Sequence, residues 1–416
     1  MGASLPSGAR SLVKISKSTV VPCVYGRYRF VTWGVTHIGA VNGALWKRCV
    51  GPFPEQGVSG SVGLWHRGPM RVVVAMSGGV DSSAAAALLK EQGHEVIGMT
   101  LRVWSYESTA QCGSCCSPDD IDDARAVAEK LGIPFYVANV EELFKERVVS
   151  PFVQSYLGGK TPIPCVACNQ DVKFGFLLKR ARQLGAKLAT GHYAQVAEKD
   201  GKFELQRGAD AAKDQSYFLF TLGQDELKDL LFPVGHLVKS EVRAIAERHG
   251  LVTTHKAESM EICFVPDGDY ARFVEKVAGA QPKGEIVTAE GEVLGAHDGI
   301  HKYTVGQRKG LQVAHSEKLY VQKIEPETNR VVVGPASEVE RQSFHLLRPH
   351  WVDGAPVEKP VTVRIRHRHQ GSPGRVKLEL NGHFKVLLDE PARAVTPGQA
   401  AVVYEGERVL GGGWIV

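Results

Sequence analysis

Short apolar runs alternate with helical patterns over the first two thirds of the chain. Unbroken apolar runs predict buried strands in "RVVVAM" (71–76), "EVIGMTLRVW" (95–104), "PFYVANV" (134–140) and "AKLATGHY" (186–193). Helical periods predict helices over 82–92, 117–132 and 172–184. Repeated β-α units of this spacing imply an α/β fold, in which a parallel sheet carries helices on both faces.

The pattern changes after about residue 280, where β-branched residues, Gly and Pro rise and helical periods stop. Runs such as "KLYVQKIEPETNRVVVG" and "RVKLELNGHFKVLLDE" predict strands and hairpins, with a two-residue turn in "LNGHF". We therefore expect small C-terminal β domains after the parallel-sheet domain. The predicted boundaries are an extension (1–69), an α/β domain (70–279), a central β domain (280–342) and a C-terminal β-barrel-like domain (343–416).

The net charge of +5 comes from the front of the chain, because residues 1–69 hold eight Lys/Arg and one acid. The body then carries a net charge of −2, so any polyanion must bind to a local patch. We expect Met70 to be the natural start, with residues 1–69 an upstream extension. The alternative is an organellar presequence, which would change the expected location from cytoplasmic to mitochondrial. The apolar runs are too short to predict a membrane span.

The segment "SGGVDSS" (77–83) joins the first predicted strand to the first predicted helix. Gly78 and Gly79 allow positive φ and close approach of a ligand, and the helix N-terminus favours phosphate. Ser77 and Ser82 add hydroxyl groups. Asp81 would repel bare phosphate, which suggests Mg²⁺ between it and a nucleotide. An ordinary turn needs one glycine rather than two framed by Ser and Asp, so we expect ATP here.

This segment resembles the PP-loop of the ATP-pyrophosphatase superfamily, whose catalytic domain has an adenine nucleotide alpha hydrolase-like fold. The resemblance implies cleavage of ATP between its α and β phosphates and transfer of AMP to an oxygen of the substrate. Members of the superfamily adenylate acids, purine carbonyls or tRNA bases, so the loop alone does not identify the substrate.

The chain has eight cysteines, of which Cys165 and Cys168 lie in "TPIPCVACN" and Cys263 lies in "EICFV". Nothing in the sequence suggests secretion, so reactive or metal-binding cysteines are favoured over a disulfide scaffold. Cys168 precedes a helix expected to begin near Asn169, whose positive end would favour the thiolate. Cys263 lies between two apolar residues, which would shield a bound persulfide.

From residue 70 to its end the chain resembles the tRNA-specific 2-thiouridylase (tRNA-uridine 2-sulfurtransferase) family. The segments that carry the resemblance are "AMSGGVDSS", "TPIPCVACN", "ATGHYA", "KDQSYFL", "FPVG", "EICFV", "YTVGQRKGL" and "AVTPGQAAV", in this order. It implies adenylation of the C2 oxygen of an unmodified wobble uridine in tRNA. Sulfur then comes from a persulfide on Cys263, with Cys168 as nucleophile, and a sulfur-relay protein or cysteine desulfurase is the donor. We expect a monomer with no membrane contact.

The same resemblance implies further site residues. The ATP site would comprise Ala75, Met76, Ser77, Gly78, Gly79, Val80, Asp81, Ser82, Leu101 and Gly191. The tRNA contacts would comprise Ile163, Pro164, Cys165, His192, Lys213, Asp214, Gln215, Arg366, His367 and Gln399. Ile163 stands where the family often has Asn, and His367 where Tyr is commoner. Independently, period 2 in "VTVRIRHRH" predicts a strand face of Arg364, Arg366 and Arg368 for phosphate contact, with Arg375 and Lys377 after a turn.

Several alternatives remain open at this stage. Cys165, Cys168 and Cys263 could hold an iron–sulfur cluster that supplies sulfide in place of the persulfide, whereas zinc would need a fourth ligand. Cys112, Cys115 and Cys116 form a second thiol group, as an accessory sulfur handler or as inert surface residues. The chain could instead be another PP-loop adenylating synthetase, or an RNA-binding module that uses nucleotide only as a structural ligand. The paired thiols argue against both.

Overall fold

The computed structural model describes residues 68–104, 118–257, 262–265, 267–356, 358–380 and 382–416 of the 416-residue chain. Nearly all of the predicted extension, the three cysteines at 112–116 and the residues 258–261 before Cys263 lie outside the described residues. Within the described ranges, no helix is both long enough and apolar enough to cross a membrane.

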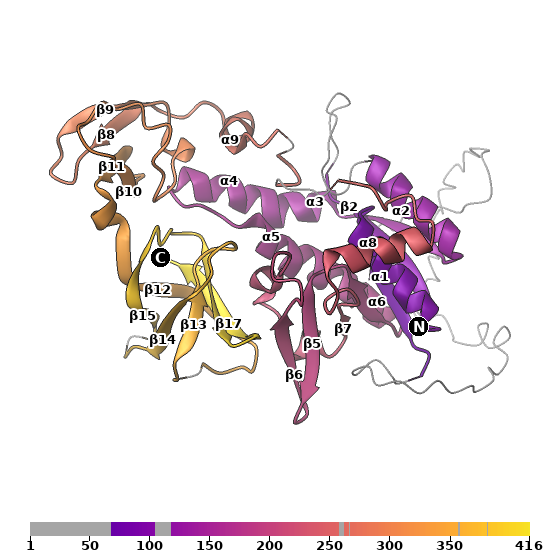
Figure 1. Cartoon of the computed structure of the whole chain (residues 1–416). Coiled ribbons are helices and arrows are strands. Elements are labelled where there is room, and N and C mark those ends of the chain that lie inside the picture. Colours follow the sequence, from indigo (N-terminus) through magenta and orange to yellow (C-terminus); the bar gives the residue numbers. More distant parts are fainter. Residues whose placement is uncertain (1–67, 105–117, 258–261, 266, 357, 381) are drawn as a thin grey trace, which may run out of the picture. The chain divides into compact units, whose positions relative to one another are not determined.

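A five-stranded parallel sheet forms the first part of the fold, as the alternating pattern predicts (Figure 1). Its strand order is β3-β2-β1-β4-β7. The strands are β1 (Arg71–Ala75), β2 (Glu95–Arg102), β3 (Phe135–Asn139), β4 (Lys187–Thr190) and β7 (Leu230–Leu231). Val72, Val73 and Val74 of β1 have no exposed surface, which is the expected condition of a central strand covered on both faces.

Helices and helical turns lie between these strands and after the last of them. They are α1 (Val80–Glu91), α2 (Pro118–Leu131), α3 (Glu141–Phe144), η1 (Lys145–Val149), α4 (Ser150–Leu157), α5 (Pro164–Ala167), η2 (Cys168–Leu178), α6 (Lys179–Gln183), η3 (Ser216–Leu219), α7 (Gln224–Leu227), α8 (Lys239–Arg248) and α9 (Tyr270–Ala278). Four consecutive alanines in α1, residues 84–87, are fully buried. Their small side chains let α1 pack closely on the sheet and beside α8 (Figure 1).

The central β domain is a four-stranded sheet in the order β10-β11-β8-β9. Its elements are β8 (Gly284–Val287), β9 (Val293–His297), η4 (Ile300–Lys302), β10 (Tyr320–Glu325), β11 (Arg330–Gly334) and η5 (Ala336–Val339). Buried Ile286, Val321, Val331 and Val333 form a separate small core. This confirms the prediction of strands in place of helices after residue 280.

The C-terminal domain is built from β12 (Glu340–Trp351), β13 (Val361–Arg364), β14 (Ser372–Leu378), β15 (Phe384–Arg393), β16 (Ala400–Glu405) and β17 (Arg408–Ile415). Strand β12 pairs with both β15 and β17, which closes the sheet into a barrel. The predicted hairpin around "LNGHF" is the antiparallel pair β14–β15. The predicted two-residue turn was wrong, because the Glu379 N–H donates to the His383 carbonyl oxygen and leaves a longer loop between them.

One hairpin belongs to the α/β domain by sequence but extends the barrel sheet. Strands β5 (Ala194–Lys199) and β6 (Lys202–Arg207) follow β4 directly, and β6 pairs with β17 through Arg408↔Gln206 and Val409↔Leu205. Tyr217 ties the same parts together, since its hydroxyl donates to the carbonyl oxygen of Ala400 at 2.9 Å. The sequence pattern did not predict this shared sheet.

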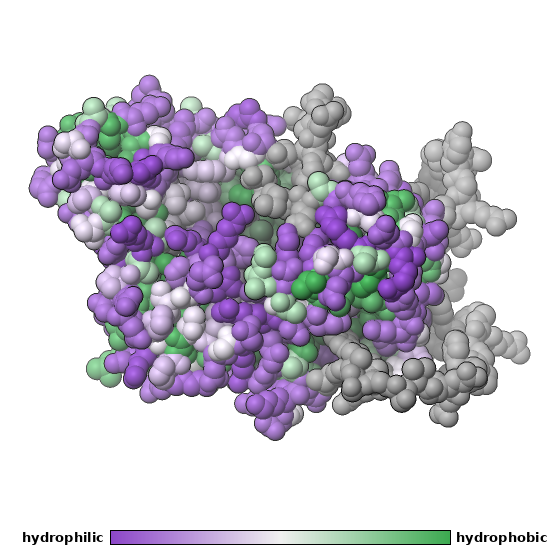
Figure 2. Space-filling model, viewed as in Figure 1, coloured by the Kyte–Doolittle hydropathy of each residue, from purple (hydrophilic) through white to green (hydrophobic). Residues whose placement is uncertain are grey.

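The described surface on the face in Figure 2 is mainly hydrophilic, with hydrophobic residues in small separate groups. Such scattered groups are ordinary on protein surfaces and need no partner to cover them. The described part of this face therefore offers no large hydrophobic patch for a ligand, and a charged ligand would be bound by individual polar and charged side chains.

Candidate active site

The turn between β1 and α1 is the first part of the candidate site. Gly78 has φ +72°, a left-handed conformation that only glycine adopts without steric cost. A Cβ at this position would lie 2.2 Å from the backbone oxygen of Asp120 at the start of α2. By contrast, a Cβ at Gly79 would meet nothing closer than the Ser77 hydroxyl, at 3.5 Å. The missing side chain at Gly78 therefore permits close packing of the turn against the start of α2. At Gly79 the turn has room for a ligand.

The serine hydroxyls of this turn hold its shape. Ser82 Oγ accepts a hydrogen bond from the Ser77 N–H (3.1 Å) and donates to the Gly79 carbonyl oxygen (3.1 Å). Ser83 Oγ donates to the same carbonyl at 2.9 Å. No side chain caps the N-terminus of α1 in the described structure. The first N–H groups of this 12-residue helix therefore suit an anion, as the sequence predicted.

The other predicted ATP-site residues divide by burial. Gly191 follows β4, where a Cβ would lie 2.6 Å from Ser82 N and 2.7 Å from the Asp81 carbonyl carbon, so its missing side chain permits close packing on α1. Leu101 is buried in the hydrophobic core. Ala75, Ser77, Gly79 and Asp81 are partly exposed, whereas Met76, Gly78, Val80 and Ser82 are buried. Contact of the buried members with a nucleotide remains a prediction.

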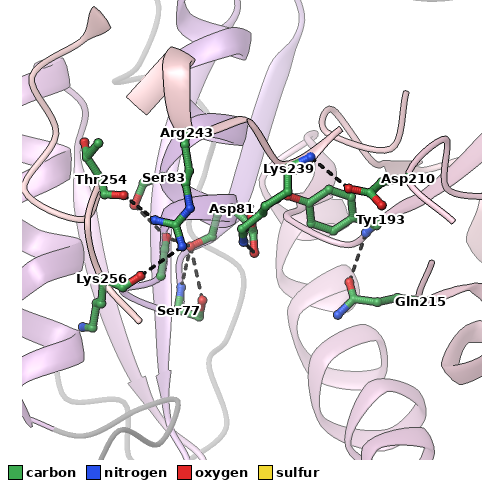
Figure 3. Close-up of polar contacts among 12 residues, drawn as sticks. Ser77, Asp81, Ser83, Tyr193, Asp210, Gln215, Lys239, Arg243, Thr254 and Lys256 are labelled. Atoms are coloured by element: carbon green, nitrogen blue, oxygen red, sulfur yellow. Dashed lines mark hydrogen bonds and ion pairs between the residues drawn. The ribbon is translucent and has the colours of Figure 1, made fainter. Parts of the chain in front are cut away.

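Asp81 has two side-chain partners that the sequence analysis missed (Figure 3). Lys239 Nζ, from the first residue of α8, lies 2.7 and 2.9 Å from its two carboxylate oxygens. The Tyr193 hydroxyl donates to Oδ1 at 2.8 Å. A lysine in the first turn of a helix interacts unfavourably with the helix dipole, so it needs a nearby carboxylate. This unfavourable position is the sequence signal that could have indicated a partner for Lys239. Mg²⁺ could use Asp81 only by displacing this ammonium group.

The segment that leads to Cys263 is fixed beside the same turn. Arg243 of α8 donates to the Thr254 carbonyl oxygen at 2.6 Å and to that of Lys256 at 3.4 Å (Figure 3). Lys256 Nζ in turn contacts Asp120 Oδ1 at 2.7 Å and the Asp123 carboxylate. Burial alone would lower the pKa of Lys256, but the two carboxylates outweigh it and raise the pKa. The segment is therefore attached to the helix that packs on Gly78.

Cys263 lies in a turn closed by the Val265 N–H, which donates to the Ile262 carbonyl oxygen at 2.8 Å. The next residue, Phe264, is 2% exposed and packs edge-on against Phe144 and Phe152, with ring centroids 5.6 and 5.1 Å apart. The buried ring holds the turn, while Cys263 itself is half-buried. This agrees with the apolar surroundings predicted for it.

The prediction that Cys168 precedes a helix was wrong. The helical segment begins at Pro164, where proline is favoured in the first turn, and runs through α5, η2 and α6 to Gln183. Cys168 is the first residue of a π-helical stretch, and exposed Cys165 occupies the first turn instead. The helix N-terminus therefore favours the Cys165 thiolate more than that of Cys168. The prediction failed because only the apolar period from Val172 onward was counted as helix.

Half-buried Cys168 and Cys263 pack against one and the same hydrophobic core. Asp171, one turn beyond Cys168, has its pKa raised by burial, an effect that Arg147 partly offsets. Among the described residues, no group of three or more His, Cys, Asp and Glu side chains is arranged to hold a metal ion. As placed, the three cysteines do not form the ligand set of an iron–sulfur cluster.

The loop predicted to contact tRNA is held from both sides. The Asp214 carboxylate accepts hydrogen bonds from the Gly208 and Ser216 N–H groups, at 3.2 and 3.0 Å. Its other oxygen is 2.7 Å from Arg364 Nη1, and both side chains are at most 10% exposed. Asp214 therefore shapes the loop, and half-buried Lys213 and Gln215 offer more surface to a ligand.

The predicted arginine face on one strand was wrong. Strand β13 ends at Arg364, so Arg366 and Arg368 lie in the following turn rather than on a strand. Arg364 is buried because its guanidinium pairs with Asp214 and lies 5.6 Å from the centre of the Tyr404 ring. Arg366, Arg368, Arg375 and Lys377 are exposed, so these four cations remain open to a ligand without Arg364.

Two other predicted tRNA contacts, His367 and Gln399, already have protein partners. The His367 ring lies against Phe218, with centroids 4.5 Å apart, and its Nε2 is 3.2 Å from the Asp214 carbonyl oxygen. Gln399 Nε2 donates to the Thr161 carbonyl oxygen at 3.0 Å, just before half-buried Ile163 and Pro164. The Gln399 contact brings a barrel loop to the start of the cysteine-bearing segment.

His192 is buried against Phe174 and Phe232, and its Nδ1 is 2.8 Å from Thr190 Oγ1. Burial, with a smaller effect of Lys173, lowers the pKa of His192 well below its ordinary value. The ring is therefore neutral near pH 7 and acts as a packed, hydrogen-bonded residue. A contact with tRNA, as predicted for His192, remains a prediction.

Three family descriptions cover the chain from residue 70. The "tRNA methyl transferase HUP domain" matches 70–267, the "tRNA methyl transferase PRC-barrel domain" 271–335, and the "Aminomethyltransferase beta-barrel domain" 341–415. An NMN synthetase structure from Francisella tularensis aligns with 51% of this chain and 78% of its own, at 18% identity and a TM-score of 0.31.

Curated relatives match over much greater length. The proteins named "tRNA-specific 2-thiouridylase MnmA" from Geotalea uraniireducens and Geobacter metallireducens are each 52% identical over 354 residues. The matches cover 83% of this chain and 94% and 96% of the relatives. That of Rhodospirillum centenum is 52% identical over 359 residues, with 83% and 91% covered. The chain belongs to the tRNA-specific 2-thiouridylase family, which are sulfurtransferase enzymes.

Proposed function

We propose that this protein catalyses the ATP-dependent 2-thiolation of the wobble uridine of tRNA, with Cys263 as persulfide carrier and Cys168 as nucleophile. The observation that carries the proposal is that these two cysteines, far apart in sequence, pack on one hydrophobic core, in the same α/β domain as the turn that suits a nucleotide. The names of the relatives support tRNA as substrate.

Activation would take place at the N-terminus of α1. The α1 N–H groups and the open side of the turn at Gly79 would bind the phosphates of ATP. The uridine C2 oxygen attacks the α-phosphorus and pyrophosphate leaves, which gives a C2–O–AMP ester. Mg²⁺ would neutralise phosphate charge in this step. Asp81, the carboxylate in the turn, is bonded to Lys239 and is therefore not free to hold the ion.

Sulfur transfer would then follow at C2. The terminal sulfur of the Cys263 persulfide attacks C2, and AMP leaves with the original C2 oxygen. The Cys168 thiolate attacks the Cys263 sulfur, and the bond between that sulfur and the transferred sulfur breaks with its electron pair moving to the transferred sulfur. The products are 2-thiouridine and a Cys168–Cys263 disulfide. The two thiols supply the two electrons that reduce the sulfane sulfur, so a thiol reductant must restore them before the next turnover.

The exposed cations of the barrel would hold the tRNA backbone. Arg366 and Arg368 lie in the turn after β13, and Arg375 and Lys377 alternate on β14. These four exposed cations lie on a body of net charge −2, and phosphate contacts of this kind position a nucleic acid without reading its sequence.

Thiolation also explains the site better than the methyl transfer in the family description's wording. Methyl transfer needs neither a turn suited to pyrophosphate nor two thiols packed on one core. Adenylation followed by sulfur transfer uses both features.

The test is a thiolation assay on the full chain with ATP, Mg²⁺, unmodified tRNA and a persulfide donor, scored as 2-thiouridine in digested tRNA. We expect wild type to form 2-thiouridine anaerobically without added iron. Cys168→Ser and Cys263→Ser should lose at least about 1000-fold in rate while still binding tRNA. Cys165→Ser removes the third thiol, and because Cys165 is a predicted tRNA contact it is assayed at saturating tRNA, where it should keep most of the thiolation rate. Activity that requires iron and Cys165 would replace the persulfide route with a cluster route.

A further inference from the structure

The loop of residues 208–215, called here the bridging loop, holds both partners of Asp81 (Figure 3). The Lys239 N–H donates to Asp210 Oδ2 at 3.0 Å. Gln215 holds the Tyr193 backbone at two points, because its N–H donates to the Tyr193 carbonyl oxygen (2.9 Å) and its Oε1 accepts from the Tyr193 N–H (3.0 Å). The loop thus fixes the backbones of Lys239 and Tyr193, whose side chains contact Asp81.

The bridging loop also has bonds that lead away from the nucleotide turn. Asp214 pairs with buried Arg364 of the barrel at 2.7 Å. Directly after the loop, the Phe218 carbonyl oxygen accepts from Asn169 Nδ2 at 3.2 Å, and Asn169 follows Cys168 in sequence. The bridging loop and the residues directly after it therefore bond to the two residues that hold Asp81, to the helix that bears Cys168 and to the barrel.

The charge on Asp81 matters for any phosphate bound at this turn. Its carboxylate lies in the first turn of α1, where it would repel phosphate, and three donor contacts from Lys239 and Tyr193 now neutralise and direct it. Lys239 and Asp81 are largely shielded from water, with side chains 13% and 32% exposed, so their interaction is only partly screened. A displacement of either partner would uncover the carboxylate.

We propose that Lys239 and Tyr193 are positioning residues for Asp81, and that the bridging loop uses them to couple tRNA binding to ATP binding. This rests on the proposed function, because the occupant of Lys213 and Gln215 is taken to be tRNA. A tRNA that binds these residues holds Asp210 and Gln215 in place, so Asp81 stays neutralised and ATP binds more tightly. By thermodynamic linkage ATP must then tighten tRNA binding by the same factor.

The experiment measures this coupling directly on the full chain. The dissociation constant of an ATP analogue that cannot be cleaved between the α and β phosphates is measured by calorimetry, with and without saturating unmodified tRNA. Wild type should bind the analogue at least about 5-fold more tightly with tRNA. Tyr193→Phe, which removes only the hydroxyl on Asp81, should reduce this factor to below about 2, as should Asp210→Ala.

Two matched variants separate positioning from folding. Asp210→Asn keeps an oxygen that can accept from the Lys239 N–H and should restore the coupling factor. Tyr136→Phe removes a hydroxyl from a tyrosine that is 50% exposed on the edge strand β3, and should leave the factor unchanged. Thermal unfolding confirms that each variant is folded, and Tyr193→Phe alone carries the test if Asp210→Ala does not fold.

The inference is overturned if wild type shows a factor within about 2-fold of one, or if folded Tyr193→Phe keeps the wild-type factor. In both cases, formation of 2-thiouridine by wild type would leave the proposed function intact. A wild-type protein that neither binds nor thiolates tRNA would instead remove the proposed function first.

Discussion

Two segments, 77–83 and 364–369, are both predicted to contact phosphate groups, but the structure builds them in different ways. The first is a turn whose shape comes from its own glycines and serines, so neighbouring residues encode it. The second begins with a buried arginine whose partner, Asp214, lies in another domain. Local backbone geometry was predictable from sequence, whereas burial by a remote partner was not.

The largest expected effect comes from the two arginines of the second segment. Arg364→Ala leaves Asp214 buried without its cation and should destabilise the protein by about 3–5 kcal/mol. Exposed Arg366→Ala should change stability by less than about 0.5 kcal/mol. It should instead weaken tRNA binding and reduce the slope of log K against log salt by about 1. Urea unfolding of both variants, and tRNA binding at several salt concentrations, measure these effects. Equal losses of stability in Arg364→Ala and Arg366→Ala would contradict the prediction.

A smaller effect is expected for the two glycines of the first segment. Gly78→Ala forces a Cβ against the Asp120 backbone at positive φ, which should cost about 1–3 kcal/mol. Gly79→Ala meets no close neighbour and should cost less than about 1 kcal/mol, yet it narrows the side open to a ligand. Unfolding midpoints measure the stability of the two variants, and ATP dissociation constants measure the effect on the ligand. Gly79→Ala with wild-type ATP affinity would show that the phosphates lie elsewhere.

The smallest effect concerns His192 and depends on pH. Its pKa is lower in the folded state than in the unfolded chain, so below about pH 6.5 the unfolded chain takes up the proton and stability falls. The stability advantage of wild type over His192→Asn should therefore shrink by up to about 1.4 kcal/mol per pH unit below that value. Urea unfolding between about pH 7 and 5 measures this, with exposed His315→Asn as control. A constant difference would mean that His192 is not held neutral.

The parallel sheet and the nucleotide turn could be predicted because apolar runs and glycines act over a few residues. The start of the cysteine helix was missed, since Pro164 and Cys165 carry no helical period and nothing in the pattern predicts a π-helix at Cys168. The Lys239–Asp81 pair was missed because its partners come from opposite ends of the α/β domain. Contacts of this kind depend on the fold as a whole.

The most direct test of the sulfur chemistry is a single turnover without added thiol reductant. Wild type loaded with one persulfide is mixed with ATP and unmodified tRNA, and its peptides are then analysed by mass spectrometry. We expect one Cys168–Cys263 disulfide for each 2-thiouridine formed. A full yield of 2-thiouridine with both cysteines still present as thiols would contradict the proposed roles of Cys168 and Cys263.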